Sequence, residues 1–417
     1  MGLDWQELYA ERFRFSQESP LGNVLRYGEL PDMISLAGGY PAAELFPAEA
    51  FREAFDRVLA TDAKVALQYS SAEGYLPLRE YLVDRMSRFG IKSSPEELLI
   101  THGSQQGLDL VARLFVDPGS LVVVEDPCYV GGLQAFNSYE ARYVAIPTDE
   151  EGMQVDRLEA ALVDGQLHPR LIYALPNFQN PSGSTLSLSR RRQLLELSHR
   201  HRIPILEDDP YGELRYEGKK LPSLKSMDSE GNVIYLGTFS KILAPGIRVG
   251  WVVAPEQVIR RLLDGKQAAD LHTSTLVQRA TYEVCRQGLL DGHVAKMRPV
   301  YRRRRDAMLR ALTEQFGSGA RWSRPEGGLF LWLQLPHVVD SDAMLQDAVA
   351  EKVAYVPGSA FSPGGEKNSA IRLNFSSSTP EQIEEGVRRL TRVASRWQEK
   401  LAEGKGPALR VNLARAA

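Results

Sequence analysis

The sequence predicts an α/β protein whose large domain contains a mostly parallel seven-stranded sheet, accompanied by a smaller α+β domain. The first observation is a series of short apolar runs between residues 98 and 254 that alternate with helical or loop segments. These runs lack strict apolar–polar alternation, which is typical of strands buried on both faces. The second observation is a change beyond about residue 290, where charged helical segments enclose a few strand-like runs.

Seven apolar runs rich in β-branched residues are the predicted strands of the large sheet. They cover residues 98–101, 121–125, 142–146, 171–175, 203–207, 233–236 and 249–254. Further on we expect a charged helix over residues 301–315, a strand-like run at 327–333, and then helix, strand and helix. The predicted divisions are an N-terminal arm with part of the small domain (1–50), the large domain (51–290), the C-terminal small domain (291–400) and a tail (401–417).

The composition excludes several classes of function. The 417 residues include 50 Lys and Arg against 53 Asp and Glu, and this net charge of −3 argues against dedicated nucleic-acid binding. Cys128 and Cys285 are too few and too far apart for a disulfide framework or a paired-cysteine zinc site, which favours the cytoplasm. The histidines show no metal-ligand spacing, and no apolar run reaches the ~18 residues that cross a bilayer. We therefore expect no metal and no membrane partner.

Polar residues gather directly after the predicted strands. In open α/β sheets, ligands bind beyond the carboxyl ends of the strands, so these residues are the candidates for a functional site. They lie at residues 102–107, 126–129, 176–183, 208–211 and 237–241. Because parallel strands end at the same edge of a sheet, we expect all of these segments to face one rim.

Lys241 is the central residue of this predicted rim. It follows a buried strand and precedes an apolar, turn-prone stretch, residues 242–246. A lysine in a partly desolvated pocket loses proton affinity and can react with an aldehyde, whereas an ordinary surface lysine cannot do so readily. An isolated lysine would be explained as a surface residue, but its surroundings here favour the reactive interpretation.

Those surroundings could hold a phosphorylated aldehyde. Ser104 and Gln105 fall where a helix begins, and free N–H groups at that end bind phosphate. Thr238 and Ser240 supply hydroxyl groups. Arg248, seven residues past Lys241, supplies a guanidinium that can donate two hydrogen bonds to a phosphate.

Other rim residues suit an aromatic ring with a nitrogen. Asp208 directly follows the predicted strand at residues 203–207, and a carboxylate buried there requires a partner such as a pyridinium nitrogen. Asn180 and Tyr211 could hydrogen-bond a phenolic oxygen, and Tyr129 could stack on the ring. Each residue alone has an ordinary explanation as a turn Asn, a capping Asp or a core Tyr. These separate explanations do not account for the position of all four residues on one rim.

The sequence resembles the fold-type I aminotransferases that use pyridoxal phosphate. Within them it is most similar to the class I/II branch that contains 2-aminoadipate and kynurenine aminotransferases, and the likeness extends from about residue 34 to about residue 390. The motifs that carry it are Ser104-Gln105-Gln106, Asn180-Pro181-Ser182-Gly183, Asp208-Asp209-Pro210-Tyr211, Ser240-Lys241 with Arg248-Val249-Gly250, and Ile371-Arg372-Leu373.

The resemblance implies a role for each of these residues. Lys241 would attach the cofactor covalently and carry the proton of the substrate Cα. Arg372 would bind the substrate α-carboxylate, with Gly39 and Asn180 beside it. The cofactor contacts implied are Asp208 at the ring nitrogen, Ser104, Gln105, Ser240 and Arg248 at the phosphate with Thr238 as a weaker candidate, Tyr129 on the ring face, and Asn180 with Tyr211 at the phenolic oxygen. Tyr69 matches a tyrosine that reaches the partner subunit's phosphate, which implies a homodimer.

The activity implied is ping-pong transfer of the α-amino group of an L-amino acid (2-aminoadipate, aromatic or aliphatic) to a 2-oxo acid, with 2-oxoglutarate expected. Residues 15–27 are expected to contact the substrate side chain. A lyase or decarboxylase with the same cofactor is an alternative, because the fold does not determine which Cα bond breaks. A sensor domain of a transcription regulator is another. It is disfavoured because Leu36-Ala37-Gly38-Gly39 lies too near the start for a DNA-binding module.

Overall fold

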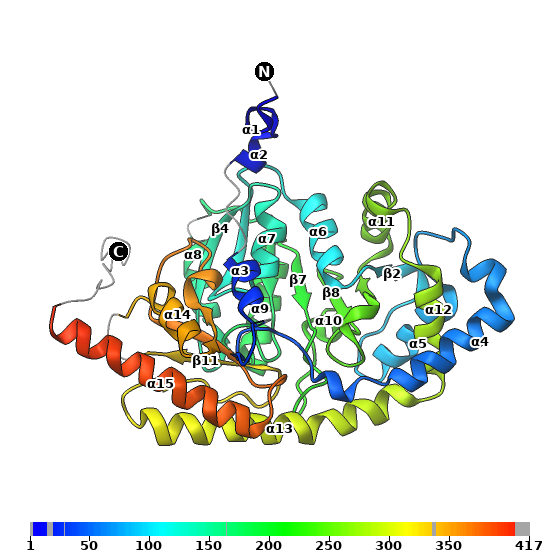
Figure 1. Ribbon diagram of the computed structural model, residues 1–417. Coiled ribbons are helices and arrows are strands. Elements are labelled where there is room, and N and C mark those ends of the chain that lie inside the picture. Colours follow the sequence, from blue (N-terminus) through cyan, green and yellow to red (C-terminus); the bar gives the residue numbers. More distant parts are fainter. Residues whose placement is uncertain (1–2, 15–19, 29, 164, 336–338, 405–417) are drawn as a thin grey trace.

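A twisted sheet of eight strands forms the centre of the computed structural model, which describes residues 3–14, 20–28, 30–163, 165–335 and 339–404 (Figure 1). In order across the sheet, the strands are β2 (Leu98–Thr101), β9 (Gly250–Val253), β8 (Val233–Thr238), β7 (Ile205–Asp208), β6 (Leu171–Ala174), β3 (Leu121–Asp126), β4 (Arg142–Asp149) and β5 (Gly152–Met153). Each of the seven predicted runs forms a strand. The predicted number was one too low because β5 has only two residues, too few to show a pattern.

The sheet is mostly parallel, as predicted, with one internal exception. Strands β8, β7, β6, β3 and β4 pair in parallel, whereas β9 runs antiparallel to both of its neighbours, β2 and β8. The start of β9 therefore lies at the same edge as the carboxyl ends of the other long strands. This reversal brings the residues that precede β9 to the predicted rim.

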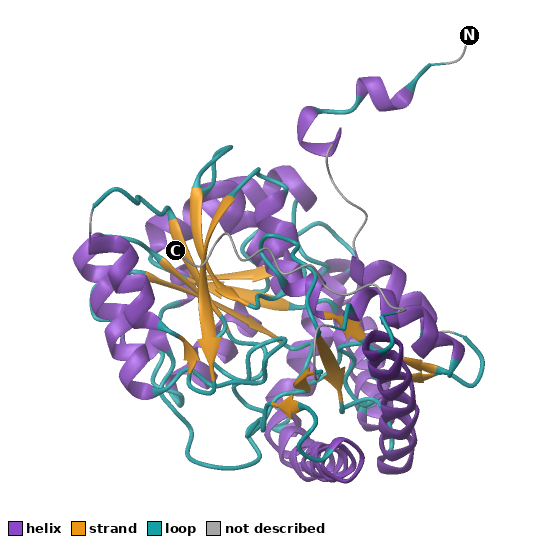
Figure 2. Ribbon diagram, turned by 90° about the vertical axis from the view of Figure 1, so that its left-hand side faces the viewer, coloured by secondary structure: helices purple, strands orange, loops and turns teal. Residues whose placement is uncertain are grey.

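Helices cover both faces of the large sheet, which explains the unbroken apolar runs (Figure 2). In β9, Trp251 and Val253 pack on one face and Val252 on the other. The helices on the first face include α4 (Ala48–Ala66), α5 (Leu76–Ser87) and α12 (Thr275–Arg286), and those on the second include α6 (Ser104–Phe115), α7 (Val130–Asn137) and α11 (Glu256–Asp270). Three more pack around the β6–β7 region: α8 (Val155–Val163), α9 (Leu188–His201) and α10 (Leu224–Met227).

A smaller four-stranded sheet lies in the C-terminal part of the chain. Its antiparallel strands are β10 (Arg321–Trp322), β11 (Phe330–Gln334), β14 (Ala370–Asn374) and β13 (Val356–Pro357). The helices α14 (Ser341–Ala350) and α15 (Pro380–Ala402) share one apolar cluster with it. The short strand β1 (Ile34–Ser35) pairs with β12 (Val353–Ala354), so an N-terminal segment lies beside this part of the chain. The domain boundaries at residues 50 and 290 stay a prediction.

The long helix α13 (Leu289–Phe316) connects the two parts of the structure and runs along one side of both (Figure 1). Met297 packs with the core of the large sheet, and Met308 packs with the core of the small one. The predicted start at residue 301 was wrong, because α13 continues through Pro299. Proline removes one backbone donor from a helix, and the packing of both halves of α13 maintains the helix across that position.

The N-terminal helices α1 (Trp5–Leu8) and α2 (Glu11–Arg14) extend away from the rest of the chain in both views (Figures 1 and 2). They are followed by α3 (Pro20–Tyr27), in which Val24 is buried against the small-sheet core. Among the described residues, no helix combines the length and the apolar character needed to cross a membrane.

Candidate active site

The register of β9 places the predicted residues together at one rim. Gly250, the first residue of β9, pairs with Thr101 at the end of β2 and with Thr238 at the end of β8. Arg248 stands two residues before Gly250 and therefore lies beside the start of α6, which follows β2. The segment after β8 carries Ser240 and Lys241 to the same place.

A cavity of about 270 Å³ opens at this rim. Most of the predicted cofactor residues line it: Ser104, Gln105, Tyr129, Asp208, Tyr211, Thr238, Ser240, Lys241 and Arg248. Gly39, Asn180 and Arg372 are joined to this set by hydrogen bonds described below. Tyr69 does not line the cavity, and its side chain is 76% exposed, with an edge-on contact to His272.

One end of the cavity has the groups that bind an anion. Helix α6 begins at Ser104 directly after Gly103, whose φ of 74° lies in the left-handed region. A Cβ atom on Gly250 would lie 2.7 Å from the Ser104 nitrogen, so only glycine lets β9 pass this close to the turn. The Arg248 guanidinium donates to the His102 carbonyl at 3.4 Å. Free N–H groups at the start of α6 and this guanidinium together form an anion site.

The side chains of Thr238 and Gln105, near this end of the cavity, already form hydrogen bonds with other protein groups. The Thr238 hydroxyl donates to the Ser240 Oγ at 3.0 Å and accepts from the Ser240 backbone N–H at 3.1 Å. The Thr238 hydroxyl is thus engaged in holding the turn that leads to Lys241. The Gln105 side-chain amide donates to the Gly131 carbonyl at 2.8 Å, which ties α6 to α7.

Lys241 is half-buried, and it lines the cavity. Its Nζ donates to the Gly39 carbonyl at 2.8 Å. Burial, reinforced by the charges of Arg372 and Arg248, lowers the pKa of Lys241 to about 8. The amine therefore loses its proton more readily than an ordinary lysine does, and the unprotonated form is the nucleophile.

Asp208 presents a buried carboxylate with one unused oxygen. Its Oδ2 accepts from the Tyr173 hydroxyl at 2.9 Å, whereas its Oδ1 is buried with no hydrogen-bond partner among the described residues. Burial raises the pKa of Asp208 to about 7. Buried polar atoms are nearly always paired, so Oδ1 is the atom from which a ligand donor is missing.

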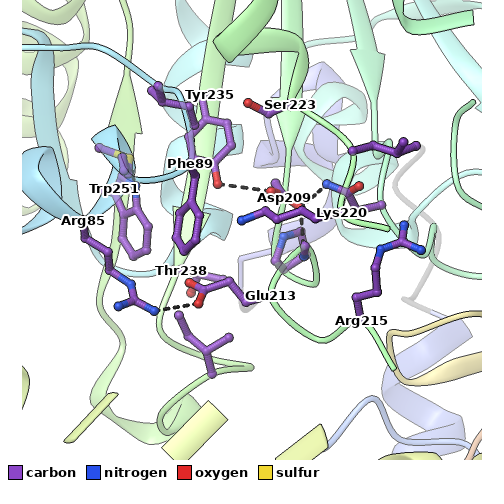
Figure 3. Close-up of a pocket in the computed structure, with 17 residues that line it drawn as sticks. Arg85, Phe89, Asp209, Glu213, Arg215, Lys220, Ser223, Tyr235, Thr238 and Trp251 are labelled. Atoms are coloured by element: carbon purple, nitrogen blue, oxygen red, sulfur yellow. Dashed lines mark hydrogen bonds and ion pairs between the residues drawn. The ribbon is translucent and has the colours of Figure 1, made fainter. Parts of the chain in front are cut away.

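The three consecutive acids at the end of β7 face different surroundings. Glu207 accepts from the backbone N–H groups of Leu224 and Lys225 at 2.8 and 2.7 Å. Asp209 points to a second cavity of about 40 Å³, where it accepts from Asn177, the Gly212 N–H and the Tyr235 hydroxyl (Figure 3). That volume suits water rather than a substrate. Glu207 and Asp209 are therefore structural, and only Asp208 is available to a ligand.

Arg372 is a buried guanidinium without a carboxylate partner among the described residues. Its Nη1 donates to the Asn180 Oδ1 at 2.9 Å and its Nη2 to the Ala37 carbonyl at 2.6 Å, while its Nε has no partner. Phe330 and Phe361 lie 4.3 and 4.9 Å from its central carbon, in cation–π contact. Burial lowers its pKa to about 10, so Arg372 stays charged at neutral pH. A buried cation of this kind favours binding of a carboxylate.

The aromatic and amide residues complete the cavity. Tyr211 is buried, hydrogen-bonds Asn180 and contacts the Phe330 ring edge-on at 5.9 Å. Asn180 therefore links Tyr211 to Arg372. Tyr129 lines the cavity with its ring against Gly131, where a Cβ atom would approach it to 2.5 Å.

Sequence reasoning missed several residues of this site. Tyr173 lies within an apolar strand, and the only available signal was that a buried tyrosine hydroxyl needs a partner. Phe330 and Phe361 lie far apart in the chain and gave no signal of a shared role. Part of the segment predicted to contact the substrate side chain, residues 15–19, lies outside the described residues.

Comparison with known proteins decides the family. The family model "Aminotransferase class I and II" matches residues 31–390. The chain belongs to this family. An aromatic-amino-acid aminotransferase of Thermococcus litoralis is 45% identical, with coverage of 93% of this chain and 94% of that protein. A 2-aminoadipate transaminase of Thermus thermophilus is 40% identical, with coverage of 94% and 97%. A crystal structure of a Pyrococcus horikoshii kynurenine aminotransferase in complex with PMP has a TM-score of 0.91, 42% identity and coverage of 94% and 98%.

These findings confirm the predicted class I/II aminotransferase, its fold and pyridoxal phosphate as its cofactor. The residues of the aminotransferase site fit this cofactor on structural grounds. A buried amine, an unpartnered carboxylate oxygen and an anion-binding helix start surround one cavity. An aldehyde, a ring nitrogen and a phosphate are the chemical complements of these three groups.

Glu125, at the end of β3, is a further buried carboxyl group close to the aminotransferase site. It accepts from the Leu175 N–H at 3.2 Å and from the Gln179 side chain at 3.4 Å. Burial raises its pKa from an ordinary value of 4.5 to about 8. The pKa of Glu125 is higher in the folded state than in the unfolded one. Its contribution to the free energy of unfolding is therefore fully present below pH 4.5 and is lost as the pH rises through about 8.

We predict that Glu125→Gln removes this pH-dependent loss, because glutamine keeps the acceptor and never ionises. The free energy of unfolding of the variant minus that of the wild type should increase between about pH 5 and about pH 9. Urea unfolding at the two pH values measures it, with the exposed Glu150→Gln as the control. A difference independent of pH would show that Glu125 does not titrate as described.

Proposed function

We propose that the cavity binds pyridoxal phosphate through the residues that line it. Lys241 attaches the cofactor, Asp208 pairs with the ring nitrogen, and Tyr129 covers the ring. Ser104, Gln105, Ser240 and Arg248 hold the phosphate, with a smaller contribution from Thr238, while Asn180 and Tyr211 bind the phenolic oxygen. The observation that supports this most directly is that one cavity is lined by both Lys241, with its amine, and Asp208, with its unpartnered carboxylate oxygen.

The chain's own groups then perform the transfer. Bound pyridoxal phosphate supplies an electron sink for the bonds at the substrate Cα. Asp208 holds positive charge at the ring nitrogen, and Arg372 with Gly39 and Asn180 holds the substrate α-carboxylate. The Lys241 amine, with its lowered pKa, would accept the proton from the substrate Cα and would donate it to the cofactor carbon that carries the transferred amino group. Amino donor and 2-oxo acceptor use the same site in turn, which gives ping-pong kinetics.

We propose aromatic and aliphatic amino acids, together with 2-aminoadipate, as amino donors and 2-oxoglutarate as the acceptor. The relatives at 40–45% identity are named for aromatic amino acids and 2-aminoadipate, which supports this range. Within residues 22–27, the described side chains offer no buried cation, since Arg26 is exposed. Residues 22–27 therefore do not require the substrate to carry a second carboxylate.

We also propose a cytoplasmic homodimer in which Tyr69 reaches the partner subunit's phosphate. Tyr69 is 76% exposed, and the nearby Leu67 and Leu271 are 69% and 55% exposed. Trp5 and Leu8 of the N-terminal arm are likewise 64% and 62% exposed. Exposed apolar side chains in such groups mark protein interfaces. The free, buried state of Cys128 and Cys285 supports a reducing location.

We predict that Lys241→Ala retains the cofactor without a covalent bond. Borohydride reduction followed by denaturation should leave the cofactor attached to the wild type and to the exposed control Lys219→Ala, but not to Lys241→Ala. In the wild type stripped of cofactor, attachment should accelerate between about pH 6 and about pH 9, because only the unprotonated amine attacks. Covalent attachment in Lys241→Ala would overturn the assignment.

Arg372→Ala should weaken substrate binding far more than cofactor binding, because it removes the two-pronged contact with the α-carboxylate. We expect kcat/KM to fall by about 100-fold or more, as for loss of one partner of a buried charged pair. Steady-state kinetics and cofactor titration, with the exposed Arg303→Ala as the control, measure the two effects separately. Equal losses in both would contradict the assigned role.

The substrate range can be tested with four amino donors. Values of kcat/KM for leucine, phenylalanine, glutamate and 2-aminoadipate with 2-oxoglutarate, or with oxaloacetate when glutamate is the donor, should all be measurable, because no buried cation selects a side-chain carboxylate in the described segment. Activity confined to glutamate and 2-aminoadipate would defeat the proposed range while leaving the cofactor assignment intact.

A further inference from the structure

Tyr173 is a buried tyrosine whose hydroxyl is directed at Asp208. It lies in β6, next to β7 in the sheet, and its side chain is fully buried. Its hydroxyl donates to the Asp208 Oδ2 at 2.9 Å. Tyr173 does not line the cavity, so it can act on a ligand only through Asp208.

The packing around Tyr173 fixes the direction of this hydroxyl. The Phe136 ring meets it edge-on at 5.5 Å. A Cβ atom on Gly132 would lie 2.7 Å from the Tyr173 Cε1 and 3.1 Å from its hydroxyl oxygen, so α7 lies directly against the ring. Burial also raises the pKa of Tyr173 well above its usual value, which keeps its proton on the oxygen. The hydroxyl is therefore a fixed donor.

Asp208 has few other groups that could orient it. The titratable groups that interact with it are Cys128 and Tyr129 after β3, Tyr173 in β6, and Asp209 and Tyr211 after β7. Among the described residues, only Tyr173 forms a hydrogen bond with the Asp208 side chain. Without it, the carboxylate would be free to rotate and would lose its one donor.

We propose that Tyr173 is a positioning residue that fixes the Asp208 carboxylate through Oδ2 and reserves Oδ1 for the ring nitrogen of the cofactor. This inference rests on the proposed pairing of Asp208 with that nitrogen. A single oriented hydrogen bond to Oδ2 favours the ionised carboxylate. It also holds Oδ1 in place before the cofactor binds, so less conformational entropy is lost on binding.

The test is equilibrium binding of two ligands to the full chain stripped of cofactor. The first is pyridoxal phosphate, and the second is its analogue in which a C–H group replaces the ring nitrogen. Tyr173→Phe should weaken binding of pyridoxal phosphate by about tenfold or more, the effect of a hydrogen bond to a charged group. It should leave binding of the analogue within about twofold of the wild type, because the analogue has no nitrogen for Asp208 to bind.

Matched variants separate this role from a general effect on packing. Tyr355→Phe removes another fully buried hydroxyl, which donates to the Ser341 carbonyl at 2.7 Å in the small-sheet part, and should change neither affinity. If Tyr173→Phe fails to fold, Gly132→Ala displaces the Tyr173 ring while keeping the hydroxyl and should show the same selective loss. Equal weakening of both ligands, or no weakening of either, would overturn the inference.

Asp208→Asn distinguishes failure of this inference from failure of the proposed function. It should also weaken pyridoxal phosphate binding selectively, because asparagine cannot hold a positive charge at the ring nitrogen. If Asp208→Asn has no selective effect, the proposed pairing itself is wrong and the inference falls with it. If Asp208→Asn acts selectively and Tyr173→Phe does not, only the positioning role is wrong.

Discussion

The close passage of β9 beside the start of α6 is the constraint on which the rest of the site depends. Gly250 pairs with both Thr101 and Thr238, and any side chain there would collide with the backbone at Gly103 and Ser104. This contact sets an antiparallel strand between two strands of opposite direction. As a result, one edge carries a helix start, the Arg248 guanidinium and the segment of Lys241, three elements that a purely parallel sheet would not bring together in this way.

A second constraint is electrostatic. Arg372 and Asp208 are buried, Lys241 is half-buried beside them, and each retains bonding capacity that the described protein groups do not use. Burying unpaired charge is unfavourable, so the site without ligands is destabilised locally. Under the proposed assignment, an aldehyde, a substrate carboxylate and a ring nitrogen supply what is missing. The unfavourable electrostatics of the empty site and the affinity for cofactor and substrate therefore have the same origin.

Much of the fold was predictable because the large sheet is covered on both faces. Strand β6, for example, is a short, continuous apolar run, and such runs mark buried parallel strands without an alignment. The two-residue β5 escaped prediction because no periodicity can be seen in so short a segment. The early start of α13 escaped because the local effect of Pro299 argues for a break, whereas packing against two cores maintains the helix.

The sequence by itself determined the chemical inventory of this aminotransferase: a lysine after a buried strand, acids at the end of another, and polar residues at the carboxyl ends of most strands. Only the tertiary structure decided which of those groups are hydrogen-bonded within the protein and which remain available to a ligand. Glu207, Asp208 and Asp209 are adjacent in the chain, yet backbone donors occupy the first and a side-chain network occupies the third. Of the three, Asp208 alone keeps an oxygen with no partner in the described part of the chain, and Tyr173 from the neighbouring strand donates to its other oxygen. Whether a carboxylate is available to a ligand depends on the groups that lie beside it in the folded sheet. These contacts join residues far apart in the chain, so the local sequence does not predict them.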